Sequence, residues 1–284
     1  MNNLRLPPIH IHPILFFFIF LSIATGMLVE LLVIFIIVLI HEMGHYSCAR
    51  FFNWRIRRIF LWVFGGVMET DEYGTRPLKE EWLVTIAGPM QHIFIFIILY
   101  GMEQTNLLPD STITLAYHYN TFILIGNLLP IWPLDGGKLV QLCLDSFFSY
   151  QISHQWMISI SMVSIVGVSI GVYLLDWFSL SFCLLMIFFI LENRLEWKQR
   201  YYKWWRFLWN RYSEVTYFPK VKILEVSTDI RLIDLFRLFK RDTFHEIKMY
   251  DKNGNIHLLT EKQCLQNYFD NKNVHARMEQ LITS

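Results

Sequence analysis

The chain has 284 residues, of which 54% are hydrophobic and only 17% are charged, and its mean hydropathy is +0.34. This balance excludes an intrinsically disordered chain and argues against a wholly soluble enzyme. Lysine and arginine number 25 and aspartate and glutamate number 24, so the net charge of +1 offers no general basic surface for nucleic acid.

Six apolar stretches approach the length of about 20 residues that a membrane-spanning helix needs. We therefore predict an α-helical polytopic membrane protein. The stretches are 13–29, 31–52, 83–101, 113–132, 157–175 and 177–191. Lysine and arginine gather after the second, fourth and sixth stretches and are missing from the other three connections. By the positive-inside rule, both termini are predicted to be cytosolic.

The second stretch contains the sequence His41-Glu42-Met43-Gly44-His45. Residues four apart lie on one face of a helix, so both imidazoles can bind one metal ion with Glu42 beside it. Because ionisable residues are costly to bury in a membrane helix, three within five positions indicate a functional site. We predict His41 and His45 as zinc ligands and Glu42 as the general base. Two alternatives stay open: unrelated polar residues in a helix bundle, and a non-catalytic metal site.

The segment 64–73 contains Gly65-Gly66 followed by Val-Met-Glu-Thr. A helical substrate must become extended before its peptide bond can be attacked, and its freed backbone groups then need partners. We predict that this segment forms a re-entrant strand that pairs with the substrate, and assign Gly65 and Gly66 to substrate binding. The alternative is an ordinary cytosolic loop.

The end of the fourth stretch supplies a candidate for the third zinc ligand, because a catalytic zinc commonly has three protein ligands and one open position. Two prolines, one of them Pro133, interrupt the helix there, and a Gly-Gly pair allows the chain to bend. Asp135 can therefore turn back toward the ion, although by itself it could merely cap the next helix. Asn127 and Pro133 are predicted substrate-binding residues, with the Asn127 amide bonding the substrate backbone.

Two other histidines, His92 and His118, lie in apolar stretches. We predict hydrogen-bonded core residues at both positions rather than metal ligands.

Residues 192–214 combine aromatic and basic residues at steps of three and four. The pattern predicts an amphipathic linker helix that lies on an anionic cytosolic leaflet. The alternative is that this helix packs on the membrane spans of the protein itself. Its apolar positions are Trp197, Tyr201, Trp204, Trp205, Leu208 and Trp209.

The tail, 215–284, is predicted to be a small α/β domain with the order strand, helix, strand, strand, helix. The turn 251–254 is a hairpin signal, and Thr260 with Gln263 has capping-box spacing at the start of the last helix. The order is similar to one cystathionine-β-synthase (CBS) module. Such modules usually work in pairs, so the resemblance implies a homo-oligomer. ATP is a second candidate ligand, although Gln263 stands where nucleotide-binding modules commonly carry aspartate.

The histidine pattern and the segment from Asn127 to Asp135 resemble the two motifs of the site-2 protease family of intramembrane zinc metalloproteases. Ala87-Gly88-Pro89-x-Gln91-His92 resembles the signature of that family's third span. The resemblance implies six spans in 1–191, one zinc ion held by His41, His45 and Asp135, and peptide hydrolysis aided by Glu42.

The resemblance is greatest to the sporulation branch of the family, whose members process pro-sigma-K. It implies a membrane-tethered pro-protein as substrate, inhibitory membrane proteins of a sporulation complex as partners, and a location in the mother-cell membrane around the forespore. A non-proteolytic metal-binding or transport protein is the alternative function. A scaffold whose tail binds partners is a third.

Overall fold

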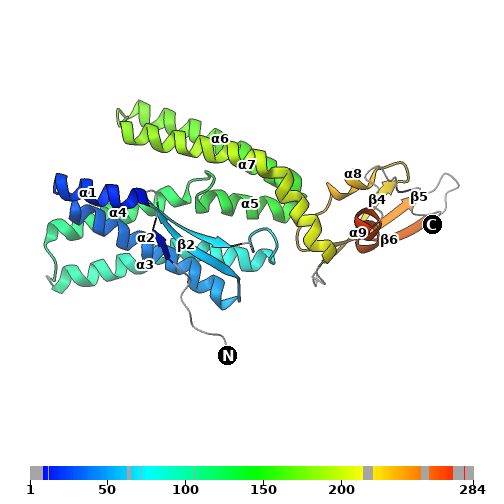
Figure 1. Ribbon diagram of the computed structural model, residues 1–284, viewed down its shortest axis with the longest axis horizontal. Helices are drawn as coiled ribbons and strands as arrows, with labels where there is room; N and C mark the ends of the chain where they lie inside the picture. Colours follow the sequence, from blue (N-terminus) through cyan, green and yellow to red (C-terminus); the bar gives the residue numbers. More distant parts are fainter. Residues whose placement is uncertain are drawn as a thin grey trace. The chain divides into compact units, whose positions relative to one another are not determined.

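The computed structural model describes residues 9–11, 13–62, 65–70, 72–105, 107–213, 220–250, 256–270 and 278. Most of these residues are helical (Figure 1). The chain divides into two compact units, Met1–Leu139 and Val140–Ser284.

Each of the six predicted apolar stretches overlaps one helix. The helices are α1 (Pro13–Thr25), α2 (Leu28–Phe51), α3 (Leu78–Thr105), α4 (Asp110–Leu128), α6 (Tyr150–Leu174) and α7 (Leu180–Ser213). Among the described residues, α2, α3 and α6 are long and apolar enough to cross a membrane. Large apolar side chains point outward, with Phe20 70%, Ile97 62% and Val163 72% exposed. Lipid would cover such side chains, which fits a multi-pass membrane protein.

In the first unit, α2 packs against both α3 and α4. Ile37, Ile95, Leu99 and Ala116 form one buried cluster between these three helices. A second cluster contains Tyr46, Ala49, Trp54, Met68 and Val84. The two clusters hold the helices that carry the polar residues described below.

A three-stranded sheet of order β1-β2-β3 lies in the same unit (Figure 1). Its strands are β1 (Ile9–Ile11), β2 (Ile56–Trp62) and β3 (Gly65–Thr70), with β2 parallel to β1 and antiparallel to β3. Gly65 and Gly66 pair with Trp62 and Leu61. The predicted strand is therefore present, while Phe64 and Asp71 lie outside the described residues.

Helix α5 (Asp135–Phe147) follows the fourth stretch, where the sequence suggested a helix that Asp135 could cap. The loop before it is closely packed, because a Cβ at Gly136 would overlap the carbonyls of Leu128 and Leu129. The Trp132-Pro133 peptide bond in this loop is cis. Glycine thus allows the first turn of α5 to lie against the end of α4, and Asp135 is the first residue of that turn.

In the second unit, α6 and α7 run side by side (Figure 1). Helix α7 is continuous through the predicted sixth span and most of the predicted linker. Its aromatic face is divided: Trp204 and Leu208 are buried in the core of the C-terminal region, whereas Trp197 and Trp209 are 43% and 52% exposed. The prediction of one leaflet-facing surface is therefore wrong for Trp204 and Leu208, because the C-terminal region covers them.

The C-terminal region has the predicted element order. It contains β4 (Lys220–Ser227), α8 (Leu232–Phe236), β5 (Thr243–Tyr250), β6 (Ile256–Thr260) and α9 (Glu261–Asp270). Strand β5 pairs parallel with β4 and antiparallel with β6. The backbone N–H of Thr260 donates to Gln263 Oε1 at 2.8 Å, and the backbone N–H of Gln263 donates to Thr260 Oγ1 at 3.3 Å. These contacts confirm the capping box. The predicted turn 251–254 lies outside the described residues.

Candidate metal centre

Three buried side chains from two helices meet in the first unit. His41 and His45 lie on α2, and Asp135 begins α5; each is 3% exposed. The two Nε2 atoms are 3.1 Å apart, and Asp135 Oδ2 lies 3.1 Å from His41 Nε2 and 2.9 Å from His45 Nε2. Three atoms of different side chains therefore face one point, as the sequence predicted.

The three donor atoms suit a zinc ion. Zinc takes imidazole nitrogen and carboxylate oxygen at about 2.0–2.2 Å, so tetrahedral ligands lie about 3.3 Å from one another. The observed separations of 2.9–3.1 Å are slightly shorter, and a small outward movement of the side chains would admit the ion. Among the described residues, this is the group of histidine and carboxylate side chains that can hold a metal.

The second oxygen of Asp135 has its own partner. Lys138, one turn further along α5, donates to Asp135 Oδ1 at 3.1 Å. Lys138 thus engages Oδ1, and Oδ2 is the oxygen that faces the two histidines.

Close packing of α2 on α3 places the His45 ring. A Cβ at Gly88 would overlap that ring, so glycine at this position allows the histidine to lie against α3. The His45 Nδ1 atom is 2.7 Å from the Val84 carbonyl oxygen. Since a carbonyl only accepts hydrogen bonds, Nδ1 carries a proton, and in the neutral ring the lone pair is then on Nε2, which faces Asp135.

The other residues singled out in the sequence lie as follows. Glu42 is 7% exposed on α2, directly after His41. Asn127 is half-buried in the last turn of α4, and Pro133 is half-buried two residues before Asp135. Gly65 and Gly66 lie in β3. His118 is exposed on α4, so the prediction of a core position was wrong there.

Sequence reasoning assigned His92 only to the core and missed its partner. His92, fully buried on α3, lies 3.1 Å from His41 Nδ1 through its Nε2 atom, and its Nδ1 atom is 2.7 Å from Asn120 Oδ1 on α4. The prediction of a hydrogen-bonded core residue is confirmed. The sequence did offer a signal for this contact. His92 and Asn120 both lie in apolar stretches, where a polar side chain needs a hydrogen-bond partner.

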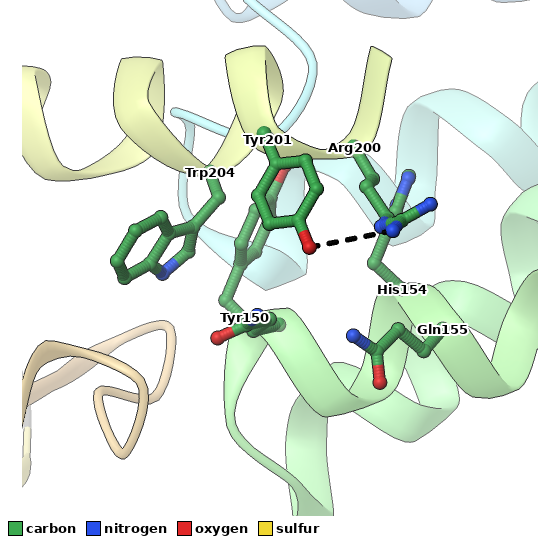
Figure 2. Close-up of a pocket in the computed structure, with 7 residues that line it drawn as sticks. Tyr150, His154, Gln155, Arg200, Tyr201 and Trp204 are labelled. Carbon is green, nitrogen blue, oxygen red and sulfur yellow. Dashed lines mark hydrogen bonds between the residues drawn. The ribbon is translucent and has the colours of Figure 1, made fainter. Parts of the chain in front are cut away.

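A separate hollow lies between α6 and α7 in the second unit (Figure 2). Tyr150 and His154 of α6 line it, together with Tyr201 and Trp204 of α7. Its free space is about that of one water molecule. This hollow is too small for a peptide.

Comparison with known proteins gives a consistent result. Residues 29–108 match the sequence profile described as Peptidase family M50. The chain is 36% identical over 275 residues to Stage IV sporulation protein FB of Bacillus subtilis, and the match covers 96% of each chain. It is 28% identical over 155 residues to a zinc metalloprotease of Methanocaldococcus jannaschii, covering 50% of this chain and 44% of that one.

A solved structure is also similar. The site-2 protease from Methanocaldococcus jannaschii superposes with a TM-score of 0.54 at 25% identity. The match covers 69% of this chain and 93% of that chain. The similarity therefore extends from the sequence to the three-dimensional arrangement.

Proposed function

Since this chain belongs to peptidase family M50, we propose that it cleaves a membrane-tethered sigma-factor precursor, pro-sigma-K, during sporulation. The chain is an intramembrane zinc metalloprotease of the site-2 type. The convergence of His41, His45 and Asp135 is the observation that carries the enzymatic part. The full-length relationship to a stage IV sporulation protein supports the choice of substrate.

His41, His45 and Asp135 would hold the ion through Nε2, Nε2 and Oδ2. A zinc ion supplies Lewis acidity when bound, which lowers the pKa of a coordinated water and polarises a carbonyl oxygen. Three protein ligands leave one position of a tetrahedral site open. This donor set distinguishes a catalytic centre from a closed structural zinc site.

Glu42 is the proposed general base. It follows His41 on α2 and is buried with it. Its carboxylate takes a proton from the attacking water and returns that proton to the amine of the leaving peptide. The new C–O bond forms and the C–N bond of the peptide breaks. The hydroxyl group of the water ends on the new carboxyl group and its proton on the new amine.

Strand β3 would present the substrate. Among the described residues it pairs with β2 alone, which leaves its other edge open for an extended peptide. Gly65 and Gly66, at the start of β3, would allow the peptide backbone to approach closely. Asn127 lies in the last turn of α4, and Pro133 lies in the loop between α4 and α5. Both are proposed to bind the substrate segment next to the cleaved bond.

The proposed arrangement in the membrane has six spans within 1–191 and both termini in the cytosol. The helices α1, α2, α3, α4, α6 and the first part of α7 would be the spans. Residues 192–214 would form the linker and 215–284 a CBS-like regulatory domain. The proposed location is the mother-cell membrane around the forespore.

The order and pairing of β4, β5 and β6 support the CBS-like assignment. Because such modules usually pair, the proposed assembly is a homo-oligomer. Inhibitory membrane proteins of a sporulation complex are the proposed partners. ATP stays a second candidate ligand, against which Gln263 argues because its side chain is engaged with Thr260.

Reconstitution tests the proposed substrate. The full-length chain would be placed in lipid vesicles with pro-sigma-K, with a second vesicle sample carrying an unrelated membrane-tethered protein. We expect pro-sigma-K to be shortened, chelator to stop the reaction, and added zinc to restore it. If pro-sigma-K stayed intact while the unrelated protein in the second sample was cleaved, the proposed substrate would be wrong. Bound zinc without cleavage of either protein would favour the metal-binding or transport alternative.

A further inference from the structure

A chain of hydrogen bonds leads from the metal centre across three helices. His41 on α2 contacts His92 on α3, which in turn contacts Asn120 on α4. His92 and Asn120 are both fully buried. Neither residue reaches the metal position itself, because the His41 ring lies between.

One backbone carbonyl group determines which atom donates in each hydrogen bond between His41, His92 and Asn120. The Asn120 Nδ2 atom lies 3.1 Å from the carbonyl oxygen of His92. A carbonyl only accepts, so Nδ2 is the amide nitrogen and the other end of the Asn120 amide is its oxygen. That oxygen is 2.7 Å from His92 Nδ1 and also only accepts, so His92 Nδ1 carries a proton.

A neutral histidine has one protonated nitrogen, so His92 Nε2 must be the acceptor at the other end of the ring. Its partner at 3.1 Å, His41 Nδ1, is then the donor. A neutral His41 that is protonated on Nδ1 has a free lone pair on Nε2. That is the nitrogen that faces His45 and Asp135.

We propose that His92 and Asn120 are positioning residues that hold His41 in the tautomer able to bind zinc. The Val84 carbonyl does the same for His45 with a single acceptor. Ligand histidines commonly donate their second N–H to such a partner, and loss of the partner typically weakens metal affinity 10–100-fold. Here the partner is another histidine, whose own tautomer depends on Asn120.

The alternative is that His92 only fills space between α2, α3 and α4. The two readings differ in what the ring must provide. A space-filling role requires its volume, whereas a positioning role requires a hydrogen-bond acceptor at the position of Nε2. Glutamine can place its amide oxygen near that position, and phenylalanine keeps the ring but provides no acceptor.

The test measures the zinc dissociation constant by chelator competition in the full-length chain. We expect His92→Phe to weaken zinc binding about 10–100-fold and His92→Gln to bind zinc within about threefold of the unmodified chain. The matched control is His118→Phe, an exposed histidine on α4, which should not change affinity. Unchanged affinity in His92→Phe, or equal losses in the Phe and Gln variants, would overturn the proposal.

A second measurement is made on the unmodified protein, so its readout needs no substitution of His92 or Asn120. The ¹⁵N resonances of the His41 ring in metal-free protein distinguish the two tautomers, with His41→Asn providing the assignment. We expect the Nδ1–H form; the Nε2–H form would overturn the proposal.

The proposal rests on the metal site of the proposed function, but it can fail separately. Zinc bound through His41 in a chain that cleaves substrate, with His92→Phe unaffected, would leave the protease assignment intact. Conversely, loss of the proposed substrate would not change the zinc affinities or the ring tautomer.

Discussion

Gly88 and His45 are in contact, and the contact has no room for a Cβ atom. The His45 ring cannot easily move away, because its two nitrogens contact Val84 and Asp135. Gly88→Ala should therefore displace the ring and weaken zinc binding by about tenfold or more. Zinc affinity of the purified protein is the measurement.

The matched control for this change is Gly101→Ala in the same helix, where a Cβ would meet nothing within 4 Å. We expect that variant to bind zinc normally. Equal affinities for Gly88→Ala and Gly101→Ala would show that the packing of α3 on His45 does not determine the metal site.

Asp135→Asn replaces a charged ligand with a neutral amide and leaves Lys138 without its ion pair. We expect zinc affinity to fall by at least about 100-fold, since loss of a ligand exceeds loss of a partner to a ligand. Metal content after dialysis measures this. Asp110→Asn, at the exposed start of α4, is the control and should retain zinc. Full zinc content in Asp135→Asn would remove Asp135 from the ligand set.

The free edge of β3 predicts a cross-link to substrate. In a chain whose four cysteines are replaced, with Glu42→Gln to prevent cleavage, Gly66→Cys should form a disulfide with a cysteine beside the scissile bond. Lys262→Cys on α9, an exposed position of the C-terminal region, is the control. Gel mobility without reductant measures the product. Cross-linking at Lys262→Cys alone would contradict the assignment of β3.

The C-terminal region should lose stability in acid. Burial would raise the pKa of Glu261, but a hydrogen bond from His245 and the charge of Arg211 bring it below its usual value. The stability from Glu261 is thus present above about pH 4.5 and is lost as the pH falls through the lower, folded-state pKa. Burial lowers the pKa of His245, so stability from the neutral ring also declines as the pH falls below about 6.5.

Hydrogen exchange, corrected for its intrinsic pH dependence, measures this effect in the whole protein. We expect protection of β5 and α9 to decrease as the pH falls from 7 to 4. Glu261→Gln should be less stable at pH 7 and less sensitive to pH below 4.5. Constant protection across this interval would contradict the prediction.

The ligand pair His41 and His45 was predictable from sequence, because four residues along one helix fix their relation locally. Asp135 required the recognition of a second motif, and its position depends on the close approach of Gly136 to the carbonyls at the end of α4. The bond from His92 to Asn120 was not predictable in this way. It joins residues 28 positions apart, and it forms only through the packing of α3 on α4.

The aromatic face of α7 illustrates the same limit. Its periodicity identified an apolar surface correctly but not what covers that surface. Trp204 and Leu208 pack in the core of the C-terminal region rather than on lipid. By contrast, the capping box of Thr260 and Gln263 is a local relation and was predicted correctly.

Zinc content and cleavage, measured on the same preparation of Glu42→Gln, test the central claim most directly. Glu30→Gln, on the same helix, is the control. We predict one zinc per chain in both variants, normal cleavage in Glu30→Gln, and a loss of about 10²–10⁴-fold in Glu42→Gln, since the general base is removed while the ligands stay. Cleavage by Glu42→Gln at the unmodified rate would contradict hydrolysis at this site.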